Sequence, residues 1–201
     1  SRPTKKRRAG GKRPAPITLS PADAIQLGIR LHQQGELEQA VKLYRHVLAH
    51  LPDHVDALHF LGIAEHQLGR SEVGLALLER AVALAAPFAD LYNNYGNVLR
   101  QLGRLDAAEQ AYQRALELRP EDANALNNLA TILRERGALE QAAATFERVL
   151  ALNPEHYEAH QNLGHVYSAL QRFEEALEQH RRALLLRPRQ GDGYRELGAA
   201  L

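Results

Sequence analysis

Asparagine side chains recur at a fixed spacing in this 201-residue chain and are its first candidates for chemistry. Asn94, Asn128 and Asn162 lie 34 residues apart, and Asn93 and Asn127 directly precede the first two of them. A side-chain amide carries both a donor and an acceptor, so it can pair with the N–H and the C=O of a peptide bond at once. Such a row would bind the backbone of an extended polypeptide with little preference for its sequence.

Histidine is the other abundant candidate, with ten residues in a chain that has no cysteine. His156, His160 and His165 cluster in the sequence, and His59 lies seven residues before His66. A zinc site needs three or four ligands at tight spacing, and the pattern His-Glu-x-x-His is absent. The sequence therefore predicts no metal site, and it places these histidines on a polar surface or in a groove.

Other reactive motifs are equally weak. The stretch "GGK" at 10–12 lacks the glycine spacing and the following Ser or Thr of a phosphate-binding loop. The few Ser and Thr residues show no arrangement typical of a nucleophilic site. We therefore expect no catalytic residues and no cofactor in this chain.

The elements that position the amides follow from a 34-residue repeat. Within each unit a first apolar stripe at helical spacing, such as Leu91, Tyr95 and Val98, ends at a glycine, and a second stripe ends near a proline. The pattern predicts five antiparallel helix pairs and the start of a sixth unit. The predicted units are 21–54, 55–88, 89–122, 123–156, 157–190 and the partial 191–201.

Two units depart from this pattern. Gln171 stands where the other units have a turn glycine, and Ala86 and Pro87 replace a proline expected one place earlier. We expect the second departure to alter the connection between the second and third units. At the front end, Ser20, Pro21 and Asp23 predict an N-cap, a proline in the first turn and an acid three residues after the cap.

The period of 34, with Gly, Ala and Pro at fixed positions, resembles the tetratricopeptide repeat (TPR) family over residues 21–201. The resemblance implies an all-α, right-handed solenoid whose first helices line a concave face. On that face it places an amide row with an acidic rim, interrupted by one aromatic ring. The resulting candidates for peptide binding are Asn93, Asn94, Asn97, Asn127, Asn128, Asn162, Asp90, Asn124, Glu158 and Phe60.

Two interpretations of the amide row stay open. The amides could contact a bound peptide, or they could join neighbouring helices and set the curvature of the solenoid. The acids would favour partners carrying Lys, Arg or hydroxyl groups. Phe60, which replaces an Asn, could hold an apolar side chain of a partner, contact a second copy of the chain, or pack against residues 14–19.

Three functions follow. The first is a protein-interaction module that binds an extended peptide along the amide-lined groove. The second rests on "NNLA" (127–130) and "QNLG" (161–164), which resemble the TPR region of O-linked N-acetylglucosamine transferase and its bacterial relatives. That resemblance implies a substrate-recruiting arm of a larger transferase, although no transferase domain lies within these residues. The third is a self-assembling scaffold, because the last unit would leave its apolar residues half-covered.

Charge divides the chain unevenly. Residues 1–16 hold seven Lys or Arg and no acid, and the remainder holds 18 basic and 24 acidic residues, a balance of −6. We expect a flexible basic tail over residues 1–20, which could touch nucleic acid or anionic lipid or simply aid solubility. The lack of cysteine, of a signal peptide and of an apolar run near ~18 residues favours a cytoplasmic location.

Overall fold

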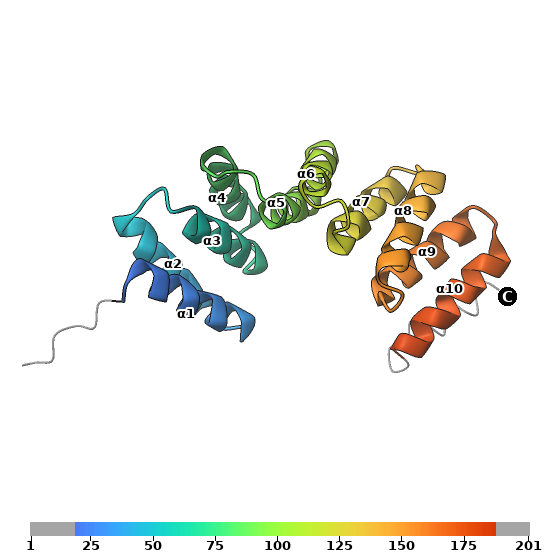
Figure 1. Cartoon of the computed structure of the whole chain (residues 1–201), viewed down its shortest axis with the longest axis horizontal. Helices are drawn as coiled ribbons and strands as arrows, with labels where there is room; N and C mark the ends of the chain where they lie inside the picture. Colours follow the sequence, from blue (N-terminus) through green and yellow to red (C-terminus); the bar gives the residue numbers. More distant parts are fainter. Residues whose placement is uncertain (1–18, 188–201) are drawn as a thin grey trace, which may run out of the picture.

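The computed structural model describes residues 19–187, which form ten α-helices (Figure 1). Most of the predicted basic tail and the partial sixth unit lie outside the described residues. The helices are α1 (Pro21–Gln33), α2 (Leu37–His50), α3 (Val55–Gln67), α4 (Ser71–Leu84), α5 (Ala89–Gln101), α6 (Leu105–Leu118), α7 (Ala123–Glu135), α8 (Leu139–Leu152), α9 (Tyr157–Ala169) and α10 (Phe173–Leu186).

The helices follow one another along an arch, and each packs against the next in sequence (Figure 1). Successive odd-numbered helices also contact one another, whereas within residues 19–187 no two even-numbered helices do. A curved stack is tightest on its inner side, so the odd-numbered helices line the concave face. The prediction of an all-α solenoid of antiparallel helix pairs is confirmed.

Three-residue turns join the two helices of each pair, and glycine makes four of the five described turns possible. Gly35, Gly69, Gly103 and Gly137 have φ between 73° and 81°, a left-handed conformation that costs glycine nothing. Gln171 adopts the same conformation in the last pair, with φ of 59°. The turn therefore keeps its shape in the unit that departs from the glycine pattern, at a conformational cost to the glutamine.

Small residues allow the paired helices to approach closely. A Cβ atom on Gly96 would lie 2.6 Å from Cε1 of Tyr112, which is fully buried on the facing helix α6. Gly28 faces Tyr44 in the same way, at 2.5 Å. In these two units the repeated glycine thus leaves the space into which a tyrosine ring of the second helix packs.

The connectors between pairs each have four residues, including the one that departs in sequence. In three of them the backbone forms a turn, and a His or Asp side chain caps the next helix, as His54 caps α3 and Asp122 caps α7. The segment 85–88 instead runs extended into α5, whose N-cap Phe88 makes no side-chain cap hydrogen bond. The shifted proline therefore alters the conformation of this connection and leaves its length unchanged. At the front of the chain, the predicted cap is confirmed, since Ser20 Oγ accepts from the Asp23 backbone N–H.

An ion pair with a buried carboxylate joins the first two helix pairs. Glu65 of α3 has no exposed surface, and its carboxylate accepts from Arg45 of α2 at 2.7 Å and from Arg70 in the turn after α3. The equivalent positions of α5 and α7 hold leucines. The first interface between units thus includes a charged contact at a position that is leucine in α5 and α7.

Candidate functional site: an amide-lined concave groove

The concave side of the third, fourth and fifth units contains a hollow of about 460 Å³. It is lined by Asn93, Asn97, Asn124, Asn127, Asn128, His156 and Glu158. An adjoining hollow of about 390 Å³ shares three of these residues and reaches Tyr157 and Arg187. Helices α5, α7 and α9 therefore present one polar groove that continues across three units.

The row Asn94, Asn128 and Asn162 bonds sideways between helices. The Asn128 amide group donates to Oδ1 of Asn93 and to Oδ1 of Asn97, both at 3.0 Å across the α5–α7 interface. Asn97 Oδ1 also accepts from the Tyr112 hydroxyl at 2.8 Å, so these four residues form one network. This row therefore holds successive first helices in register.

The two ends of the row use different partners. Asn94 Nδ2 donates to Nε2 of His59 on α3 at 3.0 Å, and Asn162 Oδ1 accepts from Arg134 of α7 at 2.8 Å. Each contact again joins two consecutive first helices. Sideways bonding is thus a property of the whole row.

Two neighbouring amides on α7 have unused hydrogen-bonding capacity. Asn124 is exposed, and its side chain has no hydrogen-bond partner among the described residues. Asn127 Oδ1 is shielded from solvent and likewise has no partner within residues 19–187. An acceptor without a partner costs free energy that a ligand N–H could recover after the Asn127 side chain rotates toward the groove. The unused hydrogen-bonding capacity of the groove therefore concentrates on α7.

Most acids on this face are compensated by arginines from the connectors. Asp90 of α5 accepts from Arg119 at 2.9 Å, and Glu158 of α9 pairs with Arg187 at 3.1 Å. Glu158 also lies 3.5 Å from Nδ1 of His156. The predicted acidic rim is consequently close to neutral in the third and fifth units.

The second unit gives the groove a different character. The ring of Phe60 is half-buried, stacks on Tyr44 at a centroid separation of 6.0 Å and lies tilted against His59 at 5.0 Å. His59 is itself buried, and burial lowers its pKa to about 4 against the opposing charges of Asp56 and Asp90. The imidazole is therefore neutral near pH 7, as required for Nε2 to accept from Asn94.

The structure brings six of the ten predicted site residues together around the first hollow: Asn93, Asn97, Asn124, Asn127, Asn128 and Glu158. Asn94, Asn162, Asp90 and Phe60 lie at equivalent positions on the neighbouring units and do not line it. The sequence analysis expected His156 on a polar surface or in a groove but did not count it among the peptide-binding candidates; it is the N-cap of α9, and its Nδ1 accepts from the Ala159 backbone N–H. Its position directly before a first helix was the available signal.

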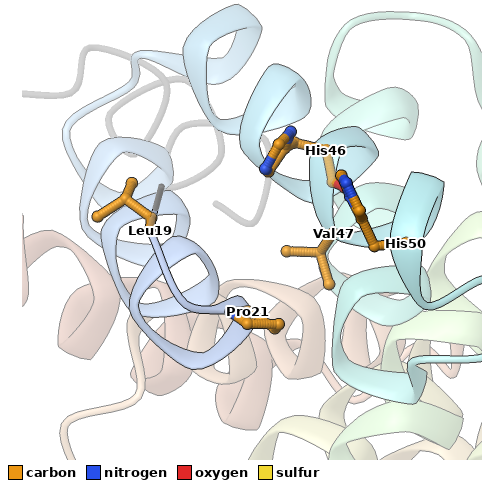
Figure 2. A pocket seen from close by; sticks show the side chains of 5 residues that line it. All are labelled: Leu19, Pro21, His46, Val47 and His50. Carbon is orange, nitrogen blue, oxygen red and sulfur yellow. The ribbon is translucent and has the colours of Figure 1, made fainter. Parts of the chain in front are cut away.

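A separate hollow, of about 310 Å³, lies between the start of α1 and α2, away from the amide-lined groove (Figure 2). It is lined by Leu19, Pro21, His46, Val47 and His50, and the two imidazoles are 4.9 Å apart between ring centroids. No group of three or more metal-ligating side chains occurs within residues 19–187. This hollow is mainly apolar and offers few polar groups to orient a ligand.

No helix in the described part of the chain is long and apolar enough to span a bilayer.

Comparison with known proteins identifies the repeat. Three sequence profiles described as tetratricopeptide repeat match residues 25–90, 87–155 and 133–201. Among curated proteins the comparison finds no significant match. Among solved structures, YrrB, "a TPR protein with an unusual peptide-binding site", superposes with a TM-score of 0.71 at 25% identity, covering 88% of this chain and 91% of that chain.

Two further structures share the fold. PilF of Pseudomonas aeruginosa superposes with a TM-score of 0.74 at 23% identity, over 90% of this chain and 88% of its own. MamA superposes with a TM-score of 0.71 at 23% identity, over 86% and 94% of the two chains. Similarity therefore extends over most of the solenoid in each case.

Proposed function

Because the chain belongs to the tetratricopeptide repeat family, whose fold serves protein–protein interaction, we propose that it binds an extended segment of a partner protein along the concave groove. The partner's backbone would lie across α5, α7 and α9. The observation that carries the proposal is the set of open amides on α7, where Asn124 is exposed and Asn127 Oδ1 has no partner within residues 19–187.

The spacing of the groove suits an extended chain. Packed helices lie roughly 8–10 Å apart and an extended peptide advances about 3.3–3.6 Å per residue. One unit therefore serves about three residues of the partner. Contacts from amides to the peptide backbone give affinity without strong sequence preference, which fits a groove whose acids are largely neutralised by arginines.

A test follows from the difference between the amides that bond neighbouring helices and the amides on α7 with unused hydrogen-bonding capacity. Twelve-residue random peptides displayed on phage would be selected against the full chain, and the enriched peptide would then be made synthetically for fluorescence anisotropy. We expect Asn124→Ala combined with Asn127→Ala to weaken its binding about tenfold or more, the equivalent of one or two hydrogen bonds.

The matched control is Gln110→Ala, an exposed amide on the outer helix α6. It should leave affinity unchanged, and circular dichroism should show the same helix content in all variants. Equal affinities of the double variant and the wild type would refute binding through the open amides. Failure to enrich any peptide would count against the groove as a peptide site.

A further inference from the structure

The start of each first helix and the end of the same unit's second helix form a matched pair of positions. In the third and fifth units the pair is an acid and an arginine, Asp90 with Arg119 and Glu158 with Arg187, and each forms an ion pair. In the fourth unit both positions are amides, Asn124 and Asn153. These units balance charge within the pair.

The second unit lacks this balance of charge between the two positions. Asp56 is the second residue of α3, and the position that would supply its arginine is Ala85, the C-cap of α4. Asp56 is exposed and has no ion-pair partner among the described residues. Arg80 of α4 is engaged elsewhere, since it donates to Pro52 O at 3.1 Å and to Asp53 at 3.2 Å.

The histidines beside Asp56 do not replace the missing cation. Burial lowers the pKa of His59 to about 4, so its ring is neutral near pH 7. Nδ1 of His54 accepts from the backbone N–H of Ala57, so this ring caps α3 and forms no ion pair with Asp56. The carboxylate of Asp56 therefore keeps its charge uncompensated on the concave side.

An aromatic ring lies on the same face of α3. Phe60 follows Asp56 by four residues, one helical turn away, and occupies the position that holds Asn in the next three units. The long stem of a Lys or Arg can pack on such a ring while its charged head reaches a carboxylate. The next three units have no ring at the position of Phe60, and the two acids at the position of Asp56, Asp90 and Glu158, already pair with arginines.

We infer that the second unit forms a cation subsite, in which Asp56 pairs with a Lys or Arg of the bound segment and Phe60 packs against its aliphatic stem. The inference rests on the proposed function, because the segment is the one that the groove binds. It adds a direction to that binding, with the basic residue at the α3 end and backbone contacts at α7. The charge of Asp56 and the ring of Phe60 are the complementarity that selects this partner.

The test uses the peptide enriched from the random twelve-residue library and its analogue with the basic residue replaced by Gln. The replacement should weaken binding to the wild-type chain about three- to tenfold, the size of an exposed ion pair with an aromatic contact. It should have little effect on binding to Asp56→Asn. Asp90→Asn is the matched control, since Arg119 already neutralises Asp90 and the preference for the basic residue should persist.

The outcomes separate the two proposals. Enriched peptides without a basic residue, or an equal loss of the preference in Asp56→Asn and Asp90→Asn, would overturn the cation subsite while leaving the peptide groove intact. A library that yields no binding peptide overturns both. Asp56 lies on the surface, and an unchanged urea unfolding curve of Asp56→Asn would show that the substitution changes peptide affinity and not stability.

Discussion

Replacing Asn128 by alanine tests whether the amide row is a structural tie between helices. Its amide group donates to Asn93 and Asn97 at 3.0 Å, so two hydrogen bonds between α5 and α7 are lost. Each contributes about 1 kcal/mol, and alanine regains about 0.7 kcal/mol through its higher helix propensity. The free energy of unfolding should therefore fall by about 1–1.5 kcal/mol. Asn97 keeps its bond from Tyr112, which limits the loss.

Urea unfolding followed by circular dichroism measures this change, and Asn124→Ala supplies the control. Asn124 is exposed, and its side chain has no bond among the described residues, so its replacement should stay within about 0.5 kcal/mol of the wild type. A double-mutant cycle of Asn128→Ala with Asn93→Ala should give a coupling of about 1 kcal/mol. If the Asn128 and Asn124 variants proved equally stable, the ties across the interface would contribute nothing, and the reasoning would be wrong.

Three further predictions concern stability. Gln171→Gly should raise the free energy of unfolding by about 0.5–1 kcal/mol, because glycine adopts φ of 59° without strain; a lower urea midpoint would contradict this. Glu65→Leu should stay within about 1 kcal/mol of the wild type, whereas Arg45→Ala with Arg70→Ala should lower the urea midpoint further, because it leaves a buried carboxylate unpaired; equal urea midpoints of these variants would refute the difference. The pKa of His59 is about 4 in the folded protein, below its usual 6.5. Its contribution to the free energy of unfolding is therefore complete above pH 6.5, and up to about 3 kcal/mol is lost as the pH falls from 6.5 towards 4. In acid titrations of unfolding, His59→Asn should lose less stability than the wild type over that range, and equal losses would contradict this.

Helix pairing was predictable because each part of the repeat has a local physical cause. The apolar stripes specify the buried faces, and the turn glycines specify where each first helix ends. Gln171 shows the limit of this reasoning, since nothing in its residue type indicates a left-handed backbone. The preserved spacing of the repeat around it was the better guide, because packing on both sides fixes the geometry of the turn.

The site was harder to predict because an amide in a row does not reveal its partner. Asn94 and Asn128 occupy the same position in the repeat, yet one bonds a histidine and the other two asparagines. The open capacity of Asn127 depends on which neighbours fail to reach it, which only three-dimensional packing shows. By contrast, the mismatch of Asp56 with Ala85 is visible in the sequence once positions 29 residues apart are compared within each unit.

Structural ties and ligand binding are compatible roles for this groove because they use different atoms. The sideways bonds commit Asn94, Asn128 and Asn162 to neighbouring helices, which fixes the spacing of α3, α5, α7 and α9 before a ligand arrives. Fixed spacing reduces the free-energy cost of ordering the groove on binding. Asn124 and Asn127 can then meet a peptide from a rigid frame, so loosening the ties should weaken binding even where no tie residue touches the partner. On this argument Asn128→Ala should lower both stability and peptide affinity, while Asn124→Ala should lower affinity alone.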